Sequence, residues 1–356
     1  DAGRFSCGVF VDLKKAFDTV DHGILLQKLA HYGFRGLIND WFRSYLLKRV
    51  QVTVVGKDRL SKSFITCGVS QGSVLGPLLF LLNVNDIYCS SKKLKFYLFA
   101  DDTNILHSHK DLKTLEKEMN VELHNVYQWL VSNKLTLNLK KTNFVIVRPY
   151  QKRLPFFLQY TLTIVKQTIN LPGIKDHVKY LGVLIDYKLS WKNHIDSITL
   201  KLSKTIGLLS KIRHFVPFHT LVSIYNCLVV PYLRYGLIAW GQASKTQLNK
   251  LLILQKRALR FICFADRCDH AIPLFLRAKI LPPHFLYYKL LAETMHDVNN
   301  DVIPSQLKDL FIPTAKIHSY NTRSSVSNNF YIKEFALIVC AQRCCAGNAT
   351  VICHAS

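Results

Sequence analysis

Acidic residues are scarce in this sequence. Asp and Glu account for 23 of the 356 residues, against 47 Lys and Arg, so the formal net charge at pH 7 is +24. An excess of this size favours a polyanionic partner, either nucleic acid or an anionic membrane surface. Charged residues make up 20% of the chain and hydrophobic residues 49%. That composition excludes a chain disordered throughout and predicts one large globular domain or two to three ordinary ones.

Recognisable cysteine spacings are also missing. The ten cysteines are scattered, with no Cys-x-x-Cys pair to combine with histidines in a zinc site. Over a chain of this length, the pattern argues against a disulfide framework and favours reduced thiols inside the cell. Residues 1–4 have no apolar run of the kind that a signal peptide needs, so we do not expect a secreted protein.

Hydrophobic runs long enough to span a bilayer are absent as well. Gly72–Val84 is apolar but too short, and Leu221–Trp240 is interrupted by Asn226, Pro231 and Arg234. Both stretches suit helices buried in a protein core, so we expect no membrane-spanning segment and no membrane partner.

Strands and helices alternate in the first half of the chain, which predicts an α+β sheet domain. After a strand at Val178–Ile185, the pattern from Trp191 to about Asn299 is almost entirely helical. Residues 187–290 contain 16 Lys and Arg but only 3 Asp and Glu, so the helical half is also the basic half. The elements expected before it are strands at Phe5–Leu13, Gln51–Val55, Ser63–Cys67, Lys95–Ala100, Thr103–His107 and Asn143–Arg148, and helices at His22–Leu47, Gly72–Ser90 and Leu112–Ser132.

Two acidic sites lie far apart in the sequence but in similar settings. Asp12 ends an apolar strand, and Asp101 and Asp102 follow another, at a tight turn between strands. Adjacent carboxylates repel each other unless a cation or a base offsets their charge. If the two strands are neighbours in one sheet, Asp12 and Asp101 converge and form an oxygen site suited to Mg²⁺. Taken alone, the Asp-Asp pair also fits a polar hairpin tip without a function.

Five segments that include these acidic sites follow one another in a characteristic order: Val11–His22, Gly68–Pro77, Phe99–Thr103, Asn138–Thr142 and Lys179–Val183. Their residues and spacing resemble the palm motifs of reverse transcriptases of the non-LTR (LINE-type) retrotransposon class. The resemblance implies a right-hand polymerase palm, a mostly antiparallel sheet with packed helices, followed by an all-α thumb-like domain. It also implies an RNA-directed DNA polymerase that adds dNTPs to a primer 3′-hydroxyl on an RNA template. The cofactor implied is a pair of Mg²⁺ ions, for which Mn²⁺ can substitute.

The resemblance assigns catalytic roles residue by residue. Asp12, Asp101 and Asp102 match the aspartates that hold the metal ions, with the carbonyl of Leu13 as a further ligand. Lys141 lies where the family often has a lysine that protonates the departing pyrophosphate.

The same resemblance assigns the residues that contact the substrate. Phe17 matches the aromatic side chain beneath the incoming sugar, where a bulky ring excludes a 2′-hydroxyl and selects dNTPs. Gln71 and Gly72 match the segment that packs against the template base and the nucleotide, where a glycine allows the backbone to approach the ligand closely.

The helical half resembles the downstream region of the same family, with its similarity concentrated in Pro231–Gly236, Ala239–Gly241 and Leu254–Arg260. The resemblance implies a thumb that closes over the duplex and a primer-grip hairpin that steadies the primer end. Independently of the resemblance, basic side chains at near-helical spacing suit contacts with phosphates that do not depend on sequence. The residues assigned to the nucleic acid are Tyr180, Leu181 and Gly182 of the hairpin, and Lys201, Lys204, Lys211, Arg213, Lys256, Arg257 and Arg260 of the helices.

The resemblance covers roughly residues 5–330 and predicts three regions. Residues 1–188 are expected to form the palm, with most of the fingers missing; residues 189–300 are expected to form the basic helical domain. Residues 301–356 are a C-terminal extension, in which a degenerate Cys-rich tail from about residue 335 does not fit a zinc-knuckle spacing. Without fingers, we expect weak or no polymerisation by this chain itself.

The sequence thus predicts a LINE-type reverse transcriptase that works as a ribonucleoprotein in the nucleus, the cytoplasm or both, with no protein partner inferable. Two other readings stay open. The chain could be a nucleic-acid-binding remnant without catalysis, or a metal-dependent nuclease, against which Phe17, Gln71 and Gly72 argue because a nuclease needs no sugar gate. An anionic membrane surface is a more distant alternative partner.

Overall fold

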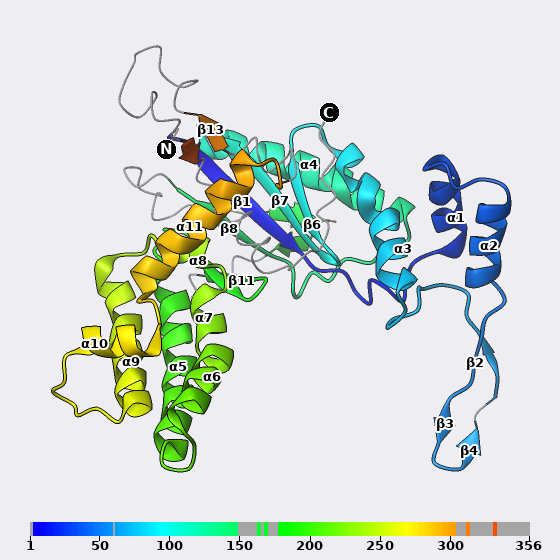
Figure 1. Cartoon of the computed structure of the whole chain (residues 1–356). Helices are drawn as coiled ribbons and strands as arrows, with labels where there is room; N and C mark the ends of the chain where they lie inside the picture. The colour runs from blue at the N-terminus through cyan, green and yellow to red at the C-terminus, as the bar shows by residue number, and fades with distance from the viewer. Residues whose placement is uncertain are drawn as a thin grey trace. The chain divides into compact units, whose positions relative to one another are not determined.

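Four antiparallel strands form the centre of the first half of the chain in the computed structural model (Figure 1). Their order in the sheet is β6 (Lys95–Phe99), β7 (Asp102–His109), β1 (Phe5–Val11) and β8 (Asn143–Val147). All seven residues of β1 are buried. This is the pattern of an inner strand covered on both faces, so the strand that leads to Asp12 lies at the heart of the sheet.

Residues 3–59, 61–148, 162–164, 167–169, 177–303, 311–313 and 330–332 are described by the structure. The chain divides between Val178 and Lys179 into two units. Two of the short strand pairs are β9 (Leu162–Ile164) with β10 (Gln167–Ile169), and β13 (Phe311–Pro313) with β14 (Phe330–Ile332). The predicted Cys-rich tail lies outside the described residues.

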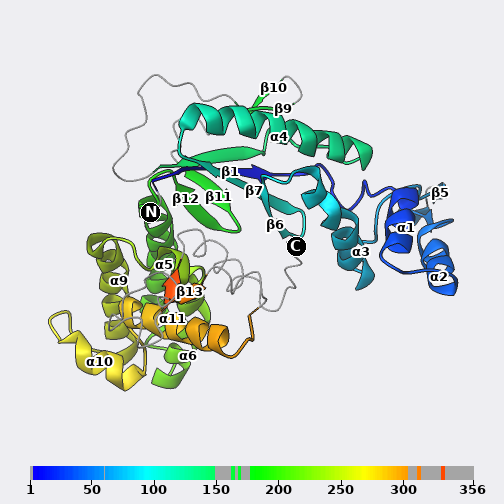
Figure 2. The same cartoon turned by 90° about the horizontal axis from the view of Figure 1, so that it is seen from above.

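Helix α4 (Leu112–Ser132) lies along one face of the sheet, against β1 and β7 (Figure 2). It begins at Asp111, whose side chain accepts a hydrogen bond from the backbone N–H of Thr114 and so satisfies one of the free N–H groups of the first turn. The sequence predicted this helix with the same bounds because its apolar residues recur every three or four positions. The residues buried on that face are Leu112, Leu115, Met119, Leu123, Val126 and Leu130.

Between β1 and β6 the chain forms helices and two short strand pairs. The helices are α1 (His22–His31), α2 (Leu37–Leu46), α3 (Leu75–Val84) and the 3₁₀ helix η1 (Asn85–Ser90). The paired strands are β2 (Val50–Gln51) with β5 (Ser63–Phe64) and β3 (Val54–Val55) with β4 (Asp58–Arg59). Helix α1 packs against both α2 and α3, and its apolar residues belong to the same hydrophobic cluster as β1.

Two predicted helices in this region differ from the structure. The single helix expected over His22–Leu47 is two helices, because Gly33 and Gly36 both adopt positive φ values, which end the first helix and turn the chain before the second. The helix expected over Gly72–Ser90 begins only at Leu75 and tightens to 3₁₀ geometry from Asn85.

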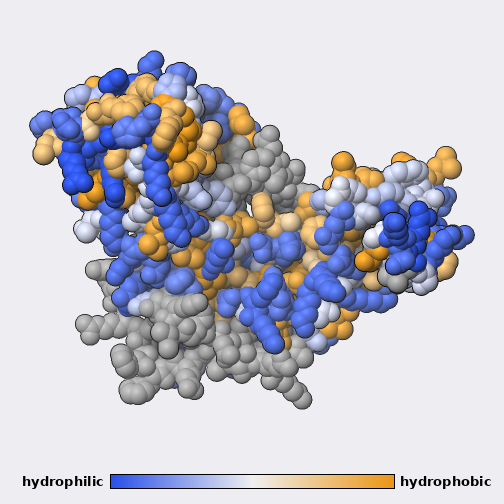
Figure 3. All heavy atoms as spheres, turned by 90° about the horizontal axis from the view of Figure 1, so that it is seen from below, coloured by the Kyte–Doolittle hydropathy of each residue, from blue (hydrophilic) through white to orange (hydrophobic). Residues whose placement is uncertain are grey.

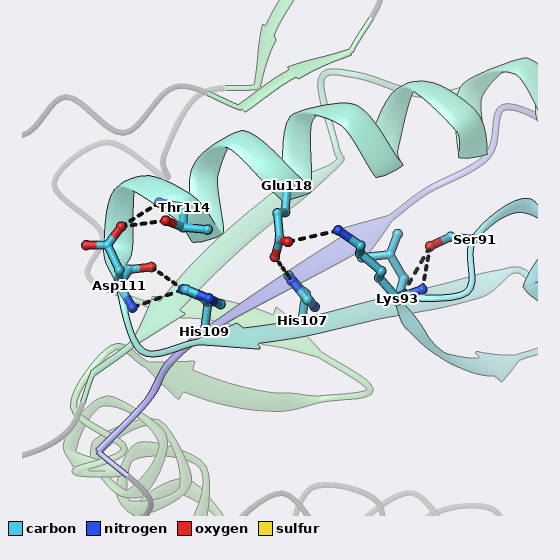
Figure 4. A network of polar contacts seen from close by, with 8 residues as sticks. Ser91, Lys93, His107, His109, Asp111, Thr114 and Glu118 are labelled. Carbon is cyan, nitrogen blue, oxygen red and sulfur yellow. Dashed lines mark hydrogen bonds and ion pairs between the residues drawn. The ribbon is translucent and has the colours of Figure 1, made fainter.

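A polar network ties α4 to the sheet (Figure 4). The carboxylate of Glu118 on α4 lies 2.8 Å from His107 Nε2 on β7 and 2.8 Å from Lys93 Nζ, just before β6. Hydrogen bonds from these two partners lower the pKa of Glu118 to about 2. The network connects the helix with the two strands that flank the Asp101–Asp102 turn.

A hairpin spans the division between the two units, and the second unit is helical from Lys192 to Asn299. Helices α5 and α9 pack against each other along their lengths, and Trp240 is fully buried beside the ring of His194. The hairpin consists of β11 (His177–Tyr180) and β12 (Val183–Asp186). The helices are α5 (Lys192–Ile212), α6 (Phe218–Leu228), α7 (Val230–Arg234), α8 (Leu237–Trp240), α9 (Lys245–Cys263), α10 (Ala271–Ala278) and α11 (Pro283–Asn299).

The fold class predicted from the sequence is confirmed: an α+β first half with an antiparallel sheet precedes an all-α region. The single strand expected at Val178–Ile185 is instead the β11–β12 hairpin, because Leu181 and Gly182 both have positive φ and turn the chain back. Strand β12 packs on α5. The division into a palm over residues 1–188 and a helical domain over residues 189–300 stays a prediction.

No helix in the described ranges is long and apolar enough to cross a membrane. The cysteines that the structure describes, Cys7, Cys67, Cys89, Cys227, Cys263 and Cys268, all have free thiols.

Candidate active site and nucleic-acid interface

The two acidic sites lie at the same end of two neighbouring strands. Asp12 follows β1 directly, and Asp102 is the first residue of β7. These strands are antiparallel, and Val11 pairs with Thr103, so one further step in the register places Asp12 opposite Asp102. Residues in opposite positions have Cβ atoms about 4.5–5.5 Å apart. Asp101 lies in the turn between β6 and β7, directly before Asp102.

The three carboxylates create a local excess of negative charge. Burial raises the pKa of Asp102, and the nearby carboxylates of Asp101 and Asp12 raise it further. Hard oxygen donors in such a field suit Mg²⁺, which would offset the repulsion. In the part of the chain that the structure describes, no group of three or more His, Cys, Asp or Glu side chains is arranged to hold a metal ion. The donor chemistry fits the metal, and the coordination itself stays a prediction.

Asp12 is held in place by the segment that follows α4. Asn138 Nδ2 donates a hydrogen bond of 2.7 Å to Asp12 Oδ2, and the backbone N–H of Asn138 donates to the carbonyl of Asp12 at 2.8 Å. Thr142 Oγ1 accepts from the backbone N–H of Asp12 at 3.3 Å and donates to the carbonyl of Asn138 at 2.9 Å. These contacts fix both the backbone and one carboxylate oxygen of Asp12.

Asn138 and Thr142 are the residues of the site that sequence reasoning missed. Their segment was recognised as one of the five motifs, but only Lys141 in it was given a role. The signal available was the pair of short polar side chains, since Asn and Thr readily form hydrogen bonds with nearby backbone groups. The sequence does not reveal that the backbone in question belongs to Asp12, 126 positions earlier.

Leu13 and Lys141 are the assigned residues next to the hydrogen bonds between Asp12 and the Asn138–Thr142 segment. Leu13 is buried and forms an isolated antiparallel bridge with Leu137, and the next N–H, that of Lys14, donates to Thr136. The side chain of Lys141 is exposed, as is that of Lys140. The structure therefore provides a second lysine beside the assigned one.

Phe17 and Gln71 lie together through contacts between their loops. The ring of Phe17 is half-buried, with its centroid 4.6 Å from that of Phe80 on α3, and its carbonyl accepts a hydrogen bond from the N–H of Val69. Gln71 Nε2 donates to Asp18 Oδ1 at 2.8 Å. These contacts bring the predicted sugar gate next to the predicted template-contacting segment.

Two further features shape the loop that carries Gln71. His22 Nε2 lies 2.7 Å from the carbonyl of Gly68, which fastens the start of the loop to the start of α1. Gly72, beside Gln71, is exposed and has a φ of +82°.

The predicted primer-grip residues form the turn of the β11–β12 hairpin. Tyr180 ends β11 and is buried, while Leu181 and Gly182 form the turn itself. The hydroxyl of Tyr235, directly after α7, donates a hydrogen bond to the carbonyl of Leu181. This contact fixes the hairpin turn to the helices of its own unit.

The predicted phosphate-contacting residues divide into two groups. Lys201, Lys204 and Lys211 are exposed on α5. In the other group, Arg260 Nη2 donates to the carbonyl of Asp269 at 3.0 Å, so part of its hydrogen-bonding capacity is already used within the chain. The guanidinium carbons of Arg213 and Arg257 both lie 5.7 Å from the ring centroid of Phe261, whereas Lys256 is half-buried on the same helix.

A family model described as reverse transcriptase (RNA-dependent DNA polymerase) matches residues 2–185. Among curated relatives, the RNA-directed DNA polymerase from mobile element jockey of Drosophila melanogaster is 29% identical over 271 residues, which are 73% of this chain and 28% of the relative. The probable RNA-directed DNA polymerase from transposon BS of the same organism is 28% identical over 276 residues, or 74% of this chain and 29% of the relative. The chain therefore spans less than a third of the length of these relatives.

A solved structure of telomerase from Candida albicans, in complex with a fragment of telomeric RNA, overlaps 80% of this chain and 45% of its own. The TM-score is 0.42 and the sequence identity 14%, a similarity too low to carry any conclusion about function.

Proposed function

Because the chain belongs to the reverse transcriptase (RNA-dependent DNA polymerase) family, we propose that it forms part of an enzyme that extends a primer with dNTPs on an RNA template. The relatives named above are enzymes of mobile elements, so the predicted resemblance to LINE-type reverse transcriptases is confirmed. The observation that supports the activity best is the meeting of Asp12 with the Asp101–Asp102 turn at one end of β1 and β7, inside the matched region.

Asp12, Asp101 and Asp102 would hold two Mg²⁺ ions, with the carbonyl of Leu13 as a further ligand and Mn²⁺ as a possible substitute. When bound, the ions would activate the primer 3′-hydroxyl and neutralise charge on the pyrophosphate. Asn138 keeps one oxygen of Asp12 in a fixed orientation through its 2.7 Å hydrogen bond.

Phe17 would exclude a 2′-hydroxyl from the sugar site, because its ring is held against Phe80 and has little freedom to move aside. Gln71 and Gly72 would contact the template base and the nucleotide. Lys141 would give a proton to the departing pyrophosphate, since its side chain is exposed near the end of the Asp12 segment.

The second unit would bind the primer–template duplex through sequence-independent contacts. The turn Tyr180–Gly182 would steady the primer end, and the exposed lysines of α5 would contact phosphates. The positive charge of the unit would also include Lys256, Arg257, Arg260 and Arg213. The contacts of these arginines with Phe261 and with the carbonyl of Asp269 would limit their access to phosphates.

Primer extension on an RNA template with dNTPs and Mg²⁺ tests the proposal. We expect the purified chain to extend the primer only weakly, and Asp101→Asn and Asp102→Asn to abolish that extension, because each removes a negative charge from the site. Glu122→Gln, on helix α4, is the matched control for loss of one acidic charge and should leave extension unchanged.

Three results decide between this function and the alternatives. Extension that persists in Asp101→Asn and Asp102→Asn would contradict the assignment of the site. Binding of primer–template without any extension by the unaltered chain would favour a nucleic-acid-binding role without catalysis. Cleavage of the template in place of extension would favour a nuclease.

A further inference from the structure

Three flat groups stack in a row beside the loop that carries Gln71. Trp41 and Tyr45 lie four residues apart on α2, with ring centroids 5.6 Å apart and planes only 11° from parallel. The guanidinium carbon of Arg49 lies 5.4 Å from the ring centroid of Tyr45, on the segment that follows the helix. Trp41, at the outer end of the row, is 53% exposed. We call Trp41, Tyr45 and Arg49 the stacking row.

The inner end of the stacking row opens into a cavity of about 660 Å³. Arg49 lines the cavity and donates a hydrogen bond of 3.0 Å from Nη1 to Ser70 Oγ. Gln51 and Gln71 add amide groups to its wall, and Phe64, which also lines it, is 72% exposed. A cavity of this size, lined by polar and apolar side chains in similar measure, is large enough to hold a nucleotide.

The chain segment that contains the stacking row is rich in cationic residues. Residues 35–63 contain seven Lys and Arg and two Asp, with no Glu. Figure 3, which views the molecule from the side toward which the β3–β4 strand pair points, shows hydrophilic residues gathered over this strand pair with hydrophobic residues beside them. The charge therefore complements a polyanion, whereas the exposed rings offer flat apolar surfaces.

We propose that the stacking row and its cavity form a binding site for single-stranded RNA. This proposal rests on the proposed function only in identifying the strand as the unpaired template. One base stacks on Trp41, and Arg49 contacts a phosphate of the same strand. Base–aromatic stacking tolerates any base, and a guanidinium both stacks and pairs with phosphate.

The cavity takes a neighbouring nucleotide of the same strand. Ser70 and Gln51 offer hydrogen bonds to a base edge or to the sugar. Asp18 also lines the cavity, beside Gln71, and its carboxylate repels phosphate. The Asp18 end of the cavity therefore receives a hydroxyl or a base N–H, and the Arg49 end receives the phosphate.

The test measures binding of a fluorescein-labelled 20-nucleotide oligo(U) RNA to the whole chain by anisotropy, in EDTA. Because no polymerisation occurs under these conditions, a loss of RNA binding is scored separately from a loss of primer extension. We expect Trp41→Ala to weaken the Kd about tenfold through loss of one stacked base, and Arg49→Ala to weaken it about tenfold through loss of its phosphate contact. Trp41→Phe should retain most of the affinity, since a flat ring remains.

Two controls show whether the effect belongs to this site. Phe215→Ala removes a ring that is 85% exposed in the second unit, so it should leave binding unchanged. Addition of oligo(U) should also quench tryptophan emission in the unaltered chain, and Trp41→Phe should remove that quench. The other three tryptophans are buried or half-buried and would respond less.

Unchanged RNA affinity in both Trp41→Ala and Arg49→Ala would overturn the proposal. An equal loss with Phe215→Ala, or a loss confined to single-stranded DNA of the same length, would also overturn it. Loss for single-stranded RNA with unchanged affinity for an RNA duplex would support it.

Discussion

At the scale of single residues, the geometry of the candidate site depends on a few hydrogen bonds between segments far apart in sequence. Asp12 carries the most of them, because Asn138 and Thr142 contact its carboxylate, its carbonyl and its N–H. A carboxylate that ligates a metal needs a fixed orientation, and the groups that orient it act on the metal through it.

Replacing Asn138 with Ala should therefore lower the rate of primer extension by about 10- to 100-fold, the usual effect of removing a group that orients a metal ligand. The Mg²⁺ concentration for half-maximal rate should rise, a change that a purely structural role would not produce. Asn125→Ala, at an exposed position of α4, is the matched control. A normal Mg²⁺ dependence in Asn138→Ala would show that Asp12 is oriented by other groups.

We expect His194 to make the helical unit sensitive to acid. Its ring is buried against Trp240, and its Nδ1 accepts a hydrogen bond from the N–H of Leu184. Burial lowers the pKa of His194 to about 4, with a smaller contribution from the positive charge of Lys201. Because the unfolded chain takes up this proton near pH 6.5, the contribution to stability is complete above that pH and is lost as the pH falls toward 4.

We expect the free energy of unfolding to drop by about 3 kcal/mol between pH 7 and pH 4 on account of this group. Urea denaturation across that range measures the change. His194→Gln should be less stable at pH 7 but should lose less of its stability on acidification. His219→Gln replaces an exposed histidine and should follow the unaltered chain. The same steep loss in His194→Gln would assign the acid sensitivity to other residues.

At the scale of elements, the site depends on where helices begin as much as on the strands. The loop before α3 carries Gln71 and is closed by a chain of contacts: Gly76 N–H donates to Ser73 Oγ, which in turn donates to the carbonyl of Ser70. A Cβ atom on Gly76 would lie 2.2 Å from that carbonyl oxygen, so only glycine fits without moving the loop.

Gly76→Ala should consequently destabilise the protein by about 3 kcal/mol, at the upper end of the usual range for overpacking, and should displace Gln71. Gly207→Ala is the matched control, because a Cβ at this position of α5 meets no atom within 4 Å. Alanine in that helix interior should stabilise the protein by about 0.5–1 kcal/mol. Denaturant titration of both variants measures the difference, and equal stabilities would mean that the Ser70 loop moves aside at little cost.

At the scale of the whole molecule, charge is unevenly distributed along the chain. Residues 187–290 carry 16 Lys and Arg against 3 Asp and Glu, and the lysines of α5 are exposed. The arginines near Phe261 are partly engaged with the ring and, for Arg260, with a backbone carbonyl. The two groups should therefore contribute unequally to nucleic-acid binding.

The salt dependence of binding to a duplex separates the two groups. If Lys201, Lys204 and Lys211 each contact a phosphate of duplex DNA, replacing all three with Ala should reduce the log–log salt slope by about 2.7. Replacing Lys256, Arg257 and Arg260 with Ala should reduce it less. Both slopes follow from affinities measured between 50 and 200 mM salt, roughly the range over which such contacts respond. An equal or larger effect of the second set would reverse the assignment.

The sequence by itself determined the family, the α+β then all-α order, the bounds of α4 and the residues of the acidic sites. These features are local, since apolar spacing determines each element and the residues of each motif are contiguous in the chain. Gly33 and Gly36 also signal the break of the first predicted helix, but the apolar pattern continues past them and predicts a single helix.

Only the tertiary structure decided which distant segments meet. Folding brings Asp12 together with the Asn138–Thr142 segment and places Arg49 on the ring of Tyr45. It also brings the hydroxyl of Tyr235 to the carbonyl of Leu181. A hydrogen bond or a ring contact depends on distances of a few ångströms. Strand register, helix ends and turns set those distances together, and no single stretch of sequence records them.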